Sequence, residues 1–129
     1  NEIAYHICSG KVFVSACRHE GFNFCPLEAM ACGVPVAMTD DGGSREYAVD
    51  GENALVVKPV DKKLLKEAID HLINDVPLRL KLIEKGMETA ASISWDEMTE
   101  KLAQLIINKL GSMEYAGESE SSSTKPCIV

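Results

Sequence analysis

The chain has 129 residues and a formal net charge of −7, which allows one domain and provides no basic surface for nucleic acid. Hydrophobic residues make up 46% of the sequence and charged residues 26%, as in an ordinary soluble globular protein. No apolar run approaches the roughly 20 residues that a membrane-spanning helix needs, and no signal peptide is visible. We therefore expect a cytoplasmic protein without a transmembrane segment.

The cysteines give no sign of a metal site. They form no C-x-x-C pair, and their spacing fits no zinc-ligand pattern. The cysteines are Cys8, Cys17, Cys25, Cys32 and Cys127. We expect them to be small buried residues in a reducing compartment, with neither a metal nor another cofactor bound to them.

The first third of the chain predicts a helix, a strand and a second helix. Residues 1–9 have apolar side chains at helical spacing, and Gly10 is the stop signal. Val12–Val14 is a short apolar run typical of a buried parallel strand. After a loop, the second helix is expected from Pro26 to about Ala31, because proline at a first helical position has no N–H to leave unpaired.

Two more strands and a helix are expected in the middle of the chain. Val34–Met38 is a buried apolar run, and the Gly-rich loop Asp40–Ser44 follows at its carboxyl end. The turn signal Asp50-Gly51 precedes a third short strand at Leu55–Val57. Asp61 is the expected N-cap of the helix that comes next.

The last part of the chain predicts two helices and a tail. One helix runs from Pro77 to about Ala91, and another follows a capping box at Ser94–Glu97. The last helix has an apolar face that invites self-association in the absence of another domain. Residues 111–129 are polar and of low complexity, so we expect them to be disordered and residues 1–110 to form the folded part.

Alternating strands and helices of this kind predict the α/β class, with a Rossmann-like parallel sheet and flanking helices. The sequence provides three strands, whereas a doubly wound sheet normally has five or more. We therefore expect the chain to be the C-terminal part of a larger domain.

The candidate site is the segment from Glu20 to Glu28, whose two carboxylates are eight positions apart. Its loop follows the first strand, and ligands of open parallel sheets bind beyond the carboxyl ends of the strands. Gly21 lets the backbone approach a ligand closely. The helix N-terminus favours phosphate, and the donors available there are the amides of Phe24, Cys25 and Leu27.

A nucleotide sugar suits the two carboxylates. Glu28 can accept two hydrogen bonds from a ribose diol, and Glu20 can accept from the hydroxyls of the group that the diphosphate carries. Simpler explanations stay open at this point. A Glu at the third helical position is favourable through capping and the helix dipole alone, and a loop Glu is usually solvated.

A second candidate is Asp40-Asp41 at the end of the second strand. The pair could bind a metal ion or accept a phosphoryl group in a phosphate- or metal-dependent α/β domain. A polar loop in which Gly42-Gly43 makes the turn explains the same residues, and we prefer that interpretation.

The central run resembles the family-4 (group 1) glycosyltransferases of the GT-B fold, in their C-terminal donor-binding domain. Lys11–Ser15 is similar to the strand before the family's signature. The run from Glu20 through Glu28 to Val36 is similar to its E-x7-E motif. Further similar residues are Gly42-Gly43, Glu46, Asp50–Asn53 and Trp95.

The resemblance implies hexosyl transfer from a nucleotide-diphosphate sugar to an unidentified acceptor, with retention at the anomeric carbon and without a divalent metal. It implies that Glu20, as the catalytic residue, hydrogen-bonds the transferred sugar, and that Glu28 binds the ribose diol. Backbone contacts to the sugar and diphosphate would come from Gly21, Phe22 and Asn23, and amides for the diphosphate from Phe24 and Cys25.

Two departures from the family pattern matter. The family's diphosphate-stabilising Arg and Lys lie upstream of the matched segment, as does its acceptor domain, so we expect this chain alone to be incompetent for turnover. Asn23 stands where Gly is common, and Asn tolerates unusual backbone angles. A non-catalytic nucleotide- or partner-binding module of the same fold is therefore an alternative function.

Overall fold

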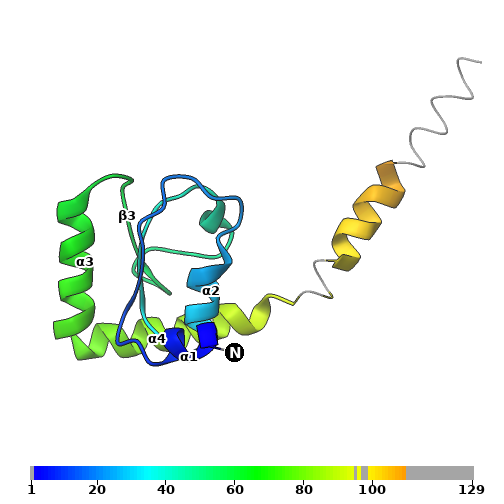
Figure 1. Cartoon of the computed structure of the whole chain (residues 1–129). Helices are drawn as coiled ribbons and strands as arrows, with labels where there is room; N and C mark the ends of the chain where they lie inside the picture. The colour runs from blue at the N-terminus through cyan, green and yellow to red at the C-terminus, as the bar shows by residue number, and fades with distance from the viewer. Residues whose placement is uncertain (1, 95, 97–98, 110–129) are drawn as a thin grey trace, which may run out of the picture. The chain divides into compact units, whose positions relative to one another are not determined.

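The computed structural model describes residues 2–94, 96 and 99–109 (Figure 1). The side chains of Ile3 and Ala4 are not among the parts described. By their contacts, residues 1–92 and residues 93–129 form two separate units. Within the described part of the chain, no helix is both long enough and apolar enough to cross a membrane. The tail predicted for residues 111–129 lies outside the described residues.

The first unit contains a three-stranded parallel sheet in the order β1-β2-β3. The strands are β1 (Phe13–Ser15), β2 (Val36–Thr39) and β3 (Leu55–Val57). The parallel sheet confirms the predicted α/β class. Its middle strand begins two residues later than expected, because Pro35 accepts a hydrogen bond from the Phe13 amide at 2.9 Å but has no N–H of its own to donate.

The α-helices of this unit lie near their predicted positions, as α1 (Glu2–Cys8), α2 (Phe24–Ala31), α3 (Lys62–Asn74) and α4 (Val76–Ser92). The short 3₁₀ helix η1 (Gly43–Glu46) was not predicted and begins within the expected Gly-rich loop. The predicted cap of α3 is confirmed, because the Asp61 carboxylate accepts from the amides of Lys63 and Leu64. Asp75 does the same for α4, accepting from the Leu78 amide at 3.0 Å.

One helix boundary differs from the prediction, and the difference bears on the site. We expected the second helix to begin at Pro26, but α2 begins at Phe24. The reason is Asn23, which adopts a left-handed conformation with φ of 56° and turns the chain into the helix two residues earlier. The other end is as predicted: Gly33, with φ of +70°, takes part in the hydrogen-bond pair of a Schellman motif.

The core is formed where helices pack on the fully buried middle strand. Figure 1 shows the strands between α3 and α2, with α4 crossing the same end of the fold as α1. A cluster of buried side chains joins β2 to α3 and α4, comprising Ala37, Ala68, Leu72 and Leu82. On the other side, Gly86 of α4 lies so close to α2 that an added Cβ would be 3.1 Å from Met30. The close contact explains a glycine inside α4.

The prediction that the cysteines are small buried residues is wrong for this fold. Cys8 and Cys32 form a disulfide, with Cα atoms 5.3 Å apart. Cys17 is a half-buried free thiol and Cys25 an exposed one. The pairing follows from topology, because α1 ends at Cys8 and α2 is capped by Cys32 at the same end of the fold. Cys127 lies outside the described residues.

In the second unit, residues 99–109 are helical. Its large apolar side chains are at least half exposed, namely Leu102, Leu105, Ile106 and Ile107. Most of the predicted capping box, together with Trp95 and Met98, lies outside the described residues.

Candidate functional site

Two loops meet at the carboxyl end of the sheet. We call them the Glu20 loop (residues 16–23) and the Asp41 loop (residues 40–43). The Glu20 amide donates to the Asp41 carbonyl at 3.2 Å, within a parallel bridge between Glu20 and Gly42. The loops touch so closely that a Cβ on Gly43 would lie 2.0 Å from the Gly21 carbonyl oxygen. The backbones of the two loops are therefore in direct contact at this edge of the sheet.

The Asn23 side chain ties the Glu20 loop to the Asp41 loop. Its amide nitrogen donates to the Asp41 carboxylate and, at 3.3 Å, to the Ser15 hydroxyl. Although Asn23 occupies the N-cap position of α2, its side chain makes no capping hydrogen bond. Its main-chain carbonyl oxygen accepts from the Tyr47 hydroxyl. Hydrogen bonds of both its side chain and its main-chain carbonyl therefore hold Asn23 in its left-handed conformation.

Asp41 is a buried carboxylate, only 2% exposed. Besides the contact with Asn23, it accepts from the Ser44 amide at 2.9 Å and so begins η1. Burial raises the pKa of Asp41, but hydrogen bonds from Ser44 and Asn23 outweigh it and leave the pKa lowered. Sequence reasoning proposed Asp41 as a ligand or a turn residue and missed this role in joining the two loops.

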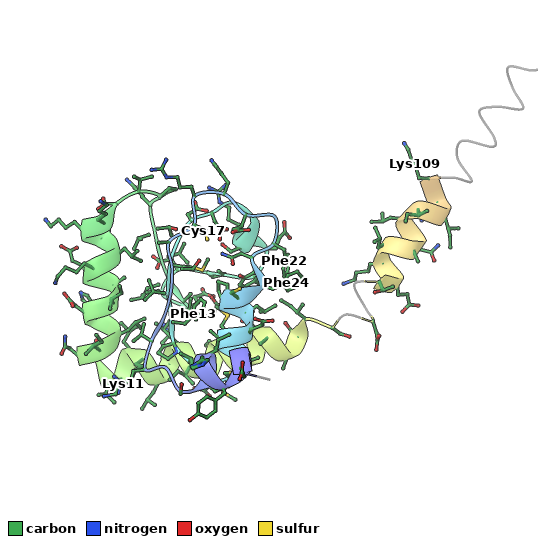
Figure 2. All side chains as sticks on the ribbon, in the orientation of Figure 1. Lys11, Phe13, Cys17, Phe22, Phe24 and Lys109 are labelled. Atoms are coloured by element: carbon green, nitrogen blue, oxygen red, sulfur yellow. A yellow bond between two sulfur atoms is a disulfide. The ribbon has the colours of Figure 1, made fainter. Side chains whose placement is uncertain are left out.

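Three aromatic rings lie beside this junction. Phe22 packs against Phe24, beside which it lies in Figure 2, with ring centroids 4.7 Å apart. Phe22 also packs against Tyr47, with centroids 5.3 Å apart. Tyr47 is 4% exposed, and its pKa is raised, first by burial and then by the negative charge of Asp41. The tyrosine therefore stays protonated and can donate to the Asn23 carbonyl.

The position of Glu28 in α2 answers one of the open questions. Because the helix begins at Phe24, Pro26 is the third helical residue and Glu28 is the fifth. A capping box needs the glutamate at the third position, so capping does not explain Glu28. Its side chain is exposed, and among the described residues the carboxylate has no hydrogen bond or ion pair.

The same shift changes the expected set of helix amides. The Leu27 amide is now at the fourth helical position, where a regular helix pairs it with the carbonyl of the cap. Leu27 is therefore not an available donor, contrary to the prediction. Cys25, at the second position, has no acceptor within a regular helix, and Pro26 has no N–H.

Glu20 combines a fixed backbone with an exposed side chain. Its amide is bonded to the Asp41 loop, whereas its carboxylate has no partner in the described part of the chain. Gly21 is exposed, and a Cβ at this position would meet no heavy atom within 4 Å. Both residues thus face space that the protein leaves open.

Asp40, in contrast, is already engaged. Arg45 grips it with two hydrogen bonds of 2.8 and 2.6 Å, and this contact lowers the pKa of Asp40. With Asp41 held by Asn23 and Ser44, both carboxylates of the pair have protein partners. Among the described residues, no group of three or more His, Cys, Asp or Glu side chains is placed to hold a metal ion. The observed partners agree with a polar loop, and Gly42 makes its turn with φ of +88°.

Comparison with known proteins identifies the family. The sequence model of the family "Glycosyl transferases group 1" matches residues 1–89, more than two thirds of the chain. The chain belongs to the group 1 glycosyltransferases. An uncharacterized glycosyltransferase of Methanocaldococcus jannaschii is 37% identical over 97 residues, which cover 75% of this chain and 28% of that protein. The chain spans less than a third of the length of the curated relatives it matches first.

Solved structures agree with this group 1 glycosyltransferase assignment. The C-terminal domain of a group 1 family glycosyl transferase from Francisella tularensis is 34% identical, with a TM-score of 0.67, over 71% of this chain and 47% of that one. Sucrose-phosphate synthase from Thermosynechococcus elongatus is 28% identical, with a TM-score of 0.74, over 86% of this chain and 28% of that one. The Rossmann-like fold of a GT-B C-terminal domain is therefore confirmed.

Proposed function

We propose that this chain is the donor-binding part of a retaining glycosyltransferase, which transfers a hexose from a nucleotide-diphosphate sugar. The observation that carries the proposal is Glu28. It is exposed, it lies past the capping position of α2, and it has no partner among the described residues. A carboxylate left unpaired beside a helix N-terminus is suited to accept two hydrogen bonds from a ribose diol.

The diphosphate would bind at the start of α2. The helix dipole favours anions there, and we propose that the Cys25 amide, which has no acceptor within a regular helix, donates to a phosphate oxygen. The family resemblance adds the neighbouring amide of Phe24 as a second donor. Gly21 supports the proposal because its open surface lets a ligand approach the backbone.

The transferred sugar would lie against the Glu20 loop. We propose that Glu20 accepts from sugar hydroxyls and is the catalytic residue of this segment. The backbones of Gly21, Phe22 and Asn23 would line the sugar and diphosphate. The hydrogen bond from the Glu20 amide to Asp41 supports this role, because it fixes the backbone from which the carboxylate projects.

The rest of the activity is proposed to reside in segments beyond this one. The family resemblance places a diphosphate-stabilising Arg and Lys, and the domain that binds the acceptor, upstream of the matched region. Of the two arginines nearest the site, Arg45 is paired with Asp40 and Arg18 is not at a matching place. We therefore expect this chain to bind the donor without turning it over.

Calorimetric titration with a panel of nucleoside diphosphates and their sugars tests the proposal. The parent should bind at least one pair, and Glu28→Ala should weaken that binding by about 1–3 kcal/mol, as for a lost hydrogen bond to a charged group. Glu84→Ala is the matched control, because Glu84 is an exposed glutamate on α4. Equal affinity of the parent and Glu28→Ala for every ligand would refute the role of Glu28.

The role of Glu20 is tested by the same titration. Glu20→Gln should reduce the extra affinity that the sugar adds to the nucleoside diphosphate, and it should leave binding of the diphosphate alone unchanged. A uniform loss for both ligands would contradict contact between Glu20 and the sugar. Donor binding by a full-length protein that transfers no sugar would favour the binding-module alternative.

A further inference from the structure

We propose that Asn23, Asp41 and Tyr47 form a hydrogen-bonded latch that positions the Glu20 loop before the donor binds. The inference rests on the proposed function, because it concerns how that site is organised. None of the three side chains is assigned a contact with the ligand. They are positioning residues, which act through the backbone of the Glu20 loop and the first turn of α2.

The latch consists of two contacts on one residue. The Asn23 side-chain amide donates to the Asp41 carboxylate, and the Asn23 main-chain carbonyl accepts from the Tyr47 hydroxyl. Asp41 and Tyr47 are 2% and 4% exposed, so water cannot easily replace either partner. Both partners belong to the segment after β2, whereas Asn23 belongs to the segment after β1.

The conformation that the latch preserves is unusual for a residue other than glycine. Asn23 has φ of 56°, in the left-handed region that side chains disfavour. Its side chain does not cap the helix, which is the common reason for Asn at that position. The contact with Asp41 therefore replaces capping, and it fixes the direction in which α2 leaves the loop.

This geometry has a consequence for binding. The Cys25 amide and Glu28 are oriented by the first turn of α2, which begins directly after Asn23. If the loop had other conformations available, the donor would bind only the fraction of molecules with the loop in place, and the apparent affinity would fall by that fraction. The latch keeps this fraction high without any of its three side chains touching the donor.

A double-mutant cycle separates a latch from a general loss of stability. Asn23→Gly keeps the left-handed backbone available and removes the side-chain hydrogen bonds to Asp41 and Ser15. Asp41→Asn places an amide donor opposite the Asn23 donor. Each variant should bind the donor about tenfold more weakly, and the loss in the double variant should fall well short of a hundredfold, because both substitutions remove the hydrogen bond between Asn23 and Asp41. Asn74→Ala, which removes a remote exposed hydrogen bond on α3, is the matched control and should bind like the parent.

Hydrogen exchange without ligand gives a readout that a purely structural role would not move. In Asn23→Gly, the amides of Leu27 and Glu28, the first that a regular helix beginning at Phe24 pairs, should exchange about tenfold faster, whereas amides of β2 should exchange as in the parent. Equal exchange in α2, or uniform acceleration throughout, would overturn the latch. If the parent binds no donor, the proposed function fails but the exchange result still decides the latch. If Asp41→Asn does not fold, Asn23→Gly alone provides both measurements.

Discussion

Replacing Gly43 by alanine tests whether the two loops depend on direct backbone contact. In the structure, a Cβ at this position would lie 2.0 Å from the Gly21 carbonyl oxygen and 2.5 Å from that of Glu20. Real Cβ contacts stay above 3.0 Å, so the loops must separate by at least 1.0 Å (3.0 less 2.0). The atoms in the way belong to the backbone, so no side chain can rotate to make room.

The expected cost follows from this separation. The hydrogen bond from the Glu20 amide to Asp41, now 3.2 Å long, would be broken, at a cost of about 1 kcal/mol. Forcing an extra methyl group into a packed contact costs about 1–3 kcal/mol more. We therefore expect Gly43→Ala to lower the free energy of unfolding by about 2–4 kcal/mol. For a unit of this size that corresponds to a fall in Tm of about 10–20 °C.

Thermal and urea unfolding, followed by circular dichroism, measure this effect directly. Gly21→Ala is the control, because a Cβ there meets no heavy atom within 4 Å. It should unfold like the parent, yet it should bind the donor more weakly, because Gly21 faces the proposed ligand. A Gly43→Ala protein whose stability is within about 0.5 kcal/mol of the parent would refute the reasoning.

Further predictions concern strain, cross-linking and charge. Val60 has φ of +66°, which a β-branched residue tolerates poorly, so Val60→Gly should raise the unfolding free energy by about 1 kcal/mol; a decrease in urea midpoint would contradict this. Replacing Cys8 and Cys32 by serine should lower the free energy of unfolding by about 3 kcal/mol, because the disulfide closes a loop with a sequence separation of 24. Reductant, which should lower the Tm of the parent, should not change the Tm of this variant. Because the pKa of Asp41 is lowered in the folded protein, its carboxylate stabilises the fold above about pH 4, and this contribution to stability is lost as the pH falls further. The stability gap between the parent and Asp41→Asn should therefore narrow in acid, and a gap that widens there would contradict the assignment.

Local sequence signals predicted the parts of the fold that local chemistry determines. The apolar run Leu55–Val57 is a strand with the predicted bounds, and Asp61 caps α3 because its carboxylate reaches the amides of the next turn. The glycine that ends α2 was equally readable, since the left-handed C-terminal position favours glycine. Each of these features depends on neighbours a few residues away.

The features that sequence reasoning missed depend on contacts between distant segments. The start of α2 was placed too late, because the conformation of Asn23 is fixed by Asp41 and Tyr47 from the next loop. The disulfide joins helix ends that only the fold brings together. The run Gly42-Gly43 was read as a turn, and it does turn, but the close approach of Gly21 is what excludes a side chain at the second glycine. Spacing along the chain contains no measure of such distances.

The central claim is that Glu28 binds the ribose diol of a nucleotide donor. Comparing a ribonucleoside diphosphate with its 2′-deoxy analogue, on the parent and on Glu28→Gln, tests it most directly. The parent should prefer the ribonucleotide by about 1–3 kcal/mol, and the variant should show little preference. The reason is that removing the 2′-hydroxyl and replacing the carboxylate disrupt the same hydrogen bond. A preference of equal size in both proteins would show that another group recognises the ribose and would contradict the account.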